Sequence, residues 1–185
     1  MRLQPEIFAS DRARELFGYW LSTAPAGEAP ARADFDPAAI PQLIPEVVMV
    51  RPTPDGDFRI SLFGTALRES FGEELTGESV FKRLGKTEAA RLRRIQEGAL
   101  TGLYGFVTLR QFYRDNGRKW SVQGLALPLK GGNGAVTRIL SAFYPLTSAE
   151  YDRRRQEGDT IDRTTLQGVW RYDIARGTFE AVDPD

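Results

Sequence analysis

The sequence contains neither cysteine nor histidine among its 185 residues. Without cysteine, the chain cannot form a disulfide, a thiol nucleophile, a thiolate metal site or a cysteinyl adduct. Without histidine, it lacks the most common general base, the most common zinc ligand and the usual haem ligand. The composition therefore excludes Ser-His-Asp and Cys-His catalysis, and no transition-metal site is expected.

The sequence also lacks an excess of charge of either sign and long apolar runs. Its 25 Lys and Arg residues balance 25 Asp and Glu residues, so neither a nucleic acid nor a membrane surface is expected as a partner. No apolar run approaches the roughly 18 residues of a membrane span, and residues 1–11 lack the hydrophobic segment of a signal peptide. These absences predict a cytoplasmic protein.

The length and the hydrophobic content of 41% indicate one globular domain with extensions. The pattern divides the chain into three parts. Residues 1–46 hold an N-terminal helix and a proline-rich segment that wraps the surface, residues 47–147 form the core, and residues 148–185 form a C-terminal helix and tail.

The N-terminal helix is predicted to begin near Ser10, a good helix-capping residue, and it presents large apolar side chains at helical spacing. A stripe of this kind must be covered, since exposed it would be unfavourable. Two partners remain open: the domain's own sheet, or the same helix of a second copy. The candidate dimer interface consists of Leu16, Phe17, Trp20 and Leu21.

The core is predicted to be an α+β fold with a five-stranded antiparallel sheet and helices on one face. Alternating or continuous apolar segments indicate strands near residues 46–50, 58–63, 105–114, 118–129 and 136–144. Glycine-containing turns join neighbouring strands, as in the sequence Asp115-Asn116-Gly117. Between the second and third strands, the chain changes to helical periodicity.

Two interpretations stay open for the C-terminal part. A helix is expected to start near Ser148, and Val169–Tyr172 can pair with Thr178–Val182 as a hairpin. The same segment is also suited to docking on a partner through Trp170 and Tyr172.

The third strand decides what faces the helices, because adjacent side chains point to opposite faces of a sheet. Arg110 and Gln111 therefore point in opposite directions. Arg110 inside would demand a carboxylate partner or an anionic ligand, since a buried unpaired charge is costly. Gln111 inside would be satisfied by Ser121 or Gln123 across the hairpin, and we predict this arrangement.

The space between sheet and helices is either a packed core or a pocket with apolar walls and a few polar groups. If it is a pocket, the walls come from the second strand and the short helix after it, and the polar groups come from the strands. The candidate ligand-binding residues are Ser61, Phe63, Leu67, Phe71, Gln111, Ser121, Gln123 and Ser141.

Four short motifs occur in an order that resembles a known family. They are Asp34-Phe35-Asp36-Pro37, Gly64-Thr65, Leu75-Thr76-Gly77 and Leu127-Pro128-Leu129. Together with the order of elements, they resemble PAS sensor domains, in a bacterial branch of small single-PAS-domain proteins with an N-terminal Trp-bearing helix. That branch often has an arginine where this chain has Ser61, so the resemblance does not carry that arginine's ligand contact over.

The resemblance implies a non-catalytic sensory or protein-interaction module in bacterial signal transduction. It further implies a homodimer, a signalling protein partner and a small ligand between sheet and helices. Among the cofactors of PAS domains, composition excludes histidine-ligated haem and the cysteinyl flavin adduct. Non-covalent flavin and a small organic acid stay open, so the cofactor is unknown.

Two alternative functions remain from the residues alone. The first is a scaffold that recruits a partner through its tail. The second is a small-molecule enzyme on a similar scaffold, with Asp34 or Glu46 as the base. Neither carboxylate has a second catalytic group beside it in the sequence, so we predict that the protein is not an enzyme.

Overall fold

The computed structural model describes residues 7–114, 117–146 and 161–183. Seven antiparallel strands form one sheet in the order β2-β1-β5-β4-β3-β6-β7. The strands are β1 Val47–Pro52, β2 Phe58–Phe63, β3 Tyr104–Arg114, β4 Lys119–Lys130, β5 Val136–Pro145, β6 Ile161–Asp173 and β7 Thr178–Val182. The helices are α1 Asp11–Ser22, α2 Thr65–Phe71 and α3 Lys86–Leu100, with short 3-10 turns at η1 Arg32–Asp34, η2 Pro37–Ala39 and η3 Ile44–Glu46.

The predicted α+β fold with an antiparallel sheet is confirmed, but the sheet has seven strands where five were expected. The five expected strands are β1 to β5. The two further strands are the C-terminal hairpin, whose first strand β6 pairs along the whole of β3, from Tyr104↔Asp173 to Arg114↔Ile161. The hairpin within residues 169–182 was predicted, and the described part of residues 148–185 continues the core sheet. The helix expected after Ser148 lies outside the described residues.

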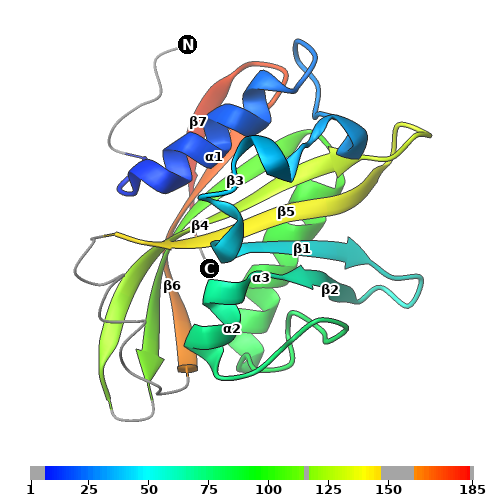
Figure 1. The fold of residues 1–185 in the computed structure, drawn as a ribbon. Coiled ribbons are helices and arrows are strands. Elements are labelled where there is room, and N and C mark those ends of the chain that lie inside the picture. Colours follow the sequence, from blue (N-terminus) through cyan, green and yellow to red (C-terminus); the bar gives the residue numbers. More distant parts are fainter. Residues whose placement is uncertain (1–6, 115–116, 147–160, 184–185) are drawn as a thin grey trace.

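Both faces of the sheet are covered (Figure 1). Helix α1 lies on one face, and α2 and α3 lie on the other, where the core helices were expected. Two large apolar clusters correspond to these two layers, one containing Leu16, Phe17 and Trp20, and the other containing Leu67, Ile95 and Ala99. The central strands are therefore buried on both sides, which explains why their sequences read as nearly continuous apolar runs.

Helix α1 docks on the chain's own sheet. Leu16, Phe17 and Trp20 are fully buried there, and Trp20 Nε1 donates a hydrogen bond to the carbonyl oxygen of Pro128 at 2.9 Å. The rings of Phe17 and Tyr172 meet edge to face with centroids 5.1 Å apart. Of the two partners considered for this helix, the sheet is the one that covers these three side chains. Leu21 alone of the four candidate dimer residues keeps partial exposure.

Glycine at position 64 allows the chain to pass from β2 into α2. A Cβ atom there would lie 2.2 Å from the carbonyl oxygen of Pro45, so no other residue fits without a backbone shift. Gly72 ends α2 with φ of 72°, the left-handed conformation that glycine adopts without strain. These two glycines fix where α2 begins and ends, and so place it on the face of the sheet that also carries α3.

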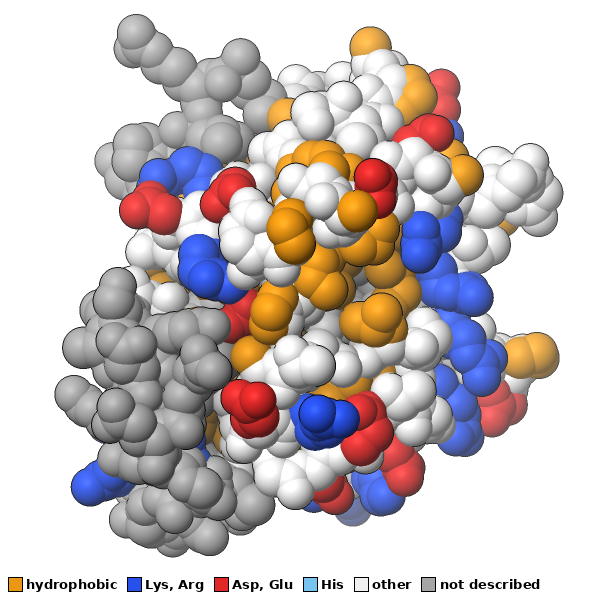
Figure 2. Space-filling model, viewed as in Figure 1, with side chains coloured by type: hydrophobic (Ala, Val, Ile, Leu, Met, Phe, Trp, Pro, Cys, Tyr) orange, Lys and Arg blue, Asp and Glu red, His pale blue; other side chains and the backbone are white. Residues whose placement is uncertain are grey.

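The outer surface carries charges of both signs. Figure 2 shows one face, on which hydrophobic side chains gather near the centre and Lys and Arg side chains lie along the margin beside β1 and β2. Arg51 and Arg59 are cross-strand neighbours in that hairpin.

Candidate functional site

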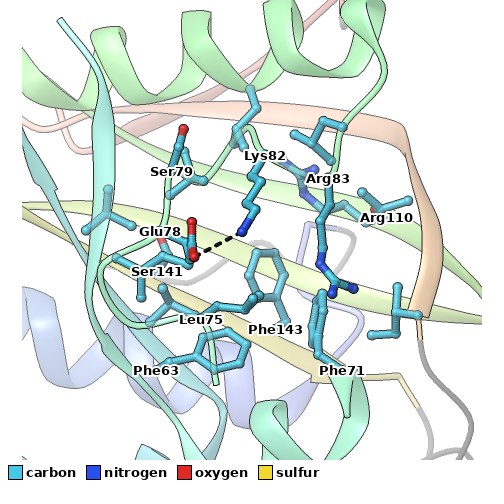
Figure 3. Close-up of a pocket in the computed structure, with 18 of the residues that line it drawn as sticks. Phe63, Phe71, Leu75, Glu78, Ser79, Lys82, Arg83, Arg110, Ser141 and Phe143 are labelled. Carbon is cyan, nitrogen blue, oxygen red and sulfur yellow. Dashed lines mark ion pairs between the residues drawn. The ribbon is translucent and has the colours of Figure 1, made fainter. Parts of the chain in front are cut away.

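A cavity of about 110 Å³ lies between the sheet and the layer formed by α2, α3 and the loop that joins them. Its walls are mainly aromatic and aliphatic. Figure 3 shows Phe63, Phe71 and Phe143 grouped together, with Lys82 and Arg83 reaching toward them from the loop. The apolar lining residues are Val48, Val50, Ile60, Phe63, Phe71, Leu75, Val80, Leu84, Leu92, Phe112, Phe143 and Ile161.

Three of the eight candidate ligand-binding residues line this cavity: Phe63, Phe71 and Ser141. Leu67 is buried in the same apolar cluster but does not reach the cavity. The aromatic part of the predicted site is thus assembled by the fold, through the contact of the Phe63 and Phe71 rings at 5.6 Å between centroids.

The other four candidates lie on the opposite side of the sheet. Ser61 Oγ donates to the carbonyl oxygen of Met49, and Gln111 Oε1 accepts from the Tyr113 hydroxyl at 3.0 Å. Ser121 is the cross-strand neighbour of Gln111. The Gln123 side chain binds the N-terminal segment: its Oε1 accepts from the amides of Ala9 and Ser10, and its Nε2 donates to the carbonyl of Ile7.

The predicted orientation of β3 is wrong. Arg110 faces the cavity and is only 4% exposed, whereas Gln111 points to the other face. Because both faces of β3 are covered, apolar residues occur on both, and their pattern gave no indication of which side carries the helices. A bulge in the pairing with β6 falls between Leu109 and Arg110, a device that often re-aims a side chain next to a functional site.

Arg110 contacts two neutral side chains, those of Thr108 and Phe143. Its Nε lies 3.4 Å from Thr108 Oγ1, and its guanidinium carbon lies 5.9 Å from the centre of the Phe143 ring. Burial lowers the pKa of Arg110 to about 10, while the negative charge of Glu88 acts in the opposite direction. The guanidinium nevertheless remains positively charged at neutral pH.

Three further polar groups of the cavity have no hydrogen-bond partner within the part of the chain that the structure describes. They are Gln96 Oε1 on α3, Ser141 Oγ on β5 and Thr164 Oγ1 on β6. Gln96 and Ser141 are 3% and 4% exposed, so water does not replace the missing partners freely. Buried polar groups without partners are uncommon in native proteins, and each requires an explanation.

Sequence reasoning missed Gln96, Thr164 and Arg110 as site residues. The signal for Gln96 was its position: it lies within the apolar stripe of α3 that also carries Leu92 and Ile95. A glutamine there interrupts an otherwise apolar face. Thr164 lies beyond the expected core, so no local pattern connected it with the cavity.

Two ion pairs lie beside the cavity, in the loop between α2 and α3. Lys82 Nζ lies 3.0 Å from Glu78 Oε1, the pair marked in Figure 3, and Arg83 pairs with Glu73. Main-chain hydrogen bonds attach this loop to β2, among them Gly77 N to Ile60 O at 2.8 Å. The loop therefore forms a defined wall.

The two carboxylates considered as catalytic bases lie away from the cavity. Glu46 is fully buried and pairs with Arg12 at 2.7 Å, close to Tyr144, whose pKa is raised chiefly by burial. Asp34 is exposed in η1. Neither residue lines the cavity.

Among the described residues, no cluster of acidic side chains has a geometry that would hold a metal ion. Nor does any helix in the described ranges combine the length and apolar character required to cross a membrane.

An antiparallel sheet that holds a mainly apolar cavity under a helical layer defines an α+β domain with an internal cavity. A family model described as "PAS domain" matches residues 8–144. The chain therefore belongs to the PAS domain family, and the predicted resemblance is confirmed. The match ends before β6, so Thr164 and Ile161 contribute to the cavity from outside the matched region.

Solved structures with similar folds include light-oxygen-voltage domains. One, from a study of a flavin analogue in such a domain, is 16% identical, covering 63% of this chain and 87% of that chain, with a TM-score of 0.47. The Aureochrome1 light-oxygen-voltage domain in its light state is 14% identical over 64% of this chain and 94% of that chain, with a TM-score of 0.44. The Vibrio cholerae VqmA dimer is 13% identical over 60% and 52%, with a TM-score of 0.45. No curated protein matches the chain.

Proposed function

We propose that this protein is a sensory module that binds a small molecule in the cavity between the sheet and α2 and α3. One observation carries the proposal: Gln96, Ser141 and Thr164 direct polar atoms into one largely apolar cavity without hydrogen-bond partners in the described ranges, and the buried Arg110 faces the same cavity. Leaving several buried polar groups unsatisfied costs free energy, and a ligand that pairs with them recovers it.

The composition of the walls supports binding and not catalysis. Small-molecule sites are mostly apolar with a few converging polar groups, as here. Among the described lining residues, Ser79 places a hydroxyl beside a carboxylate, donating to Asp57 Oδ1 at 2.8 Å, but the same hydroxyl accepts from the amide of Phe81, a local bond that explains it as part of the loop. We therefore retain a non-catalytic role, in the cytoplasm and in bacterial signalling, as part of the proposal.

Sensing also requires a contact with another molecule. We propose a homodimer, or a complex with a signalling partner, that forms through the outer surface of α1 and the exposed apolar area in Figure 2. Leu16, Phe17 and Trp20 are buried by the chain's own sheet, so they contribute to such a contact only if α1 leaves the sheet.

Native mass spectrometry of the protein as purified tests ligand binding. We expect a non-covalent adduct with the mass of a small organic molecule, and Ser141→Leu should remove it because the larger side chain projects into the cavity. Ser61→Leu is the matched control, since Ser61 lies on the opposite face and should leave the adduct intact. If the purified protein carries no adduct and binds no member of a fragment library at this cavity, the proposal fails.

A further inference from the structure

The buried guanidinium of Arg110 limits what the cavity can bind. An arginine that is 4% exposed has lost most of its hydration, and such a charge is stable only beside an opposite charge or several acceptors. Its one hydrogen bond within the described chain is a long one, from Nε to Thr108 Oγ1. The two Nη atoms therefore retain most of their capacity to donate.

The described part of the chain supplies no carboxylate to Arg110. The Glu88 charge acts on Arg110, but Oε1 of Glu88 pairs with Arg91 at 3.0 Å and its Oε2 accepts from the amide of Leu166 at 3.2 Å. The two other acidic groups near the cavity, Glu73 and Glu78, are paired with Arg83 and Lys82. Among the described lining residues, the positive charges outside these ion pairs are those of Arg110, which is buried, and Arg163, which is exposed and lies over the ring of Tyr113.

The remaining walls restrict the rest of the ligand. A second anionic group beside the rings of Phe63, Phe71 and Phe143 would find Lys82 and Arg83 already paired with Glu78 and Glu73, and the rings themselves cannot solvate it. The cavity, at about 110 Å³, is somewhat smaller than the roughly 150 Å³ engineered cavity that binds benzene, so the apolar part of the ligand must be compact. Gln96 Oε1 accepts hydrogen bonds, which favours a ligand with one donor such as a hydroxyl group.

We propose that the ligand is a small monocarboxylate with a compact apolar body, whose carboxylate pairs with Arg110 and whose body lies among Phe63, Phe71 and Phe143. The guanidinium presents two parallel N–H groups to a carboxylate, the geometry that makes this pairing strong and directional. This inference rests on the proposed function, since it names the class of molecule that the same cavity binds.

Isothermal titration calorimetry with matched acids and amides tests the charge requirement. The probes are benzoate, 4-hydroxybenzoate and hexanoate, each compared with its uncharged amide. We expect at least one acid to bind, and to bind about tenfold or more tightly than its amide, because a hydrogen bond to a charged group is stronger than one to a neutral group.

Arg110→Met should remove this preference, so that the acid and its amide bind equally, while Gln111→Met should keep it. The control lies on the same strand one residue away and points to the other face. Arg110→Lys, which keeps the charge without the paired donors, should retain a smaller preference. Circular dichroism of each variant verifies that it is folded.

The outcomes separate this inference from the function on which it rests. Equal binding of acid and amide by the native protein, or a neutral adduct in native mass spectrometry, overturns the monocarboxylate and leaves a small-molecule sensor. Acid preference that survives Arg110→Met also overturns it, because another group then recognises the charge. If no acid or amide binds and no adduct is found, both proposals fail together.

Discussion

The two faces of the sheet use similar residues in opposite ways. On the α1 face, three buried polar side chains of the described chain have partners: Trp20 donates to the carbonyl oxygen of Pro128, Tyr144 donates to that of Leu43, and Glu46 pairs with Arg12. On the α2 and α3 face, the polar groups of Arg110 and Gln96 point into a cavity. These polar groups of the first face are paired, whereas the second face leaves Gln96 Oε1, Ser141 Oγ and Thr164 Oγ1 unpaired within the described ranges, at a cost in stability.

The largest effect is expected from Trp20→Glu on the α1 face. The indole is fully buried, and its loss removes about 3–5 kcal/mol of packing before the burial of a carboxylate is counted. We expect the native fold to be lost, as measured by circular dichroism and urea titration. Ser22→Glu, at an exposed position of the same helix, should change the free energy of unfolding by less than about 1 kcal/mol. A folded, monomeric Trp20→Glu protein would show that α1 is not part of the core.

Two arginines, one on each face, give the sharpest contrast. Arg12→Met removes the guanidinium that pairs with the fully buried Glu46, and we expect a loss of about 3 kcal/mol, the lower end for breaking a buried ion pair since Arg12 itself is one-third exposed. Chemical denaturation measures the change. Glu46→Gln in combination with Arg12→Met should recover part of the loss, because no buried charge remains.

Arg110→Met should do the reverse and stabilise the ligand-free protein. An apolar side chain of similar length replaces a buried charge that has no carboxylate partner within the described ranges, and replacing buried ion pairs by apolar residues stabilises by roughly 1–4 kcal/mol. The midpoint of urea unfolding is the measurement, on protein freed of any adduct. A decrease in stability would indicate that Arg110 holds the fold together instead of waiting for a ligand.

The smallest pair of effects concerns two buried glutamines. Gln123→Leu removes three hydrogen bonds to the N-terminal segment and should destabilise by about 1–3 kcal/mol. Gln96→Leu, whose Oε1 has no partner within the described ranges, should be neutral or slightly stabilising. Thermal unfolding of both variants under the same conditions compares the faces directly. Equal losses would remove the distinction between them.

Much of the fold was predictable because its signals are local. Hairpins at tight turns and the change of periodicity after Phe63 are encoded within a few residues. At position 64 only glycine fits, because any Cβ atom would collide with the carbonyl oxygen of Pro45. The attachment of β6 to β3 was not predictable, since the partner of an edge strand depends on which edge is open and not on local pattern. The hairpin was found, and its place in the sheet was not.

The candidate site was predictable only in its aromatic part. Phe63 and Phe71 follow from the strand and helix that carry them, and Ser141 follows from β5. The choice between Arg110 and Gln111 depended on which face of β3 met the cavity. Apolar side chains on both faces of β3 gave no guidance, so the prediction placed Gln111 inside, because burying an amide costs less than burying a charge. The protein instead buries Arg110.

Strand β6 reaches both layers of the molecule. Near one end it contributes Thr164 to the cavity, opposite Phe112 of β3, and near the other end it contributes Tyr172 to the aromatic cluster under α1. An extended strand cannot lengthen much. Between Thr164 and Tyr172, the pairing with β3 has one irregularity, the bulge opposite Leu109 and Arg110. Strand β6 is therefore a direct connection between the cavity and the apolar layer under α1. A displacement of Thr164 along the strand that the bulge does not absorb also displaces Tyr172.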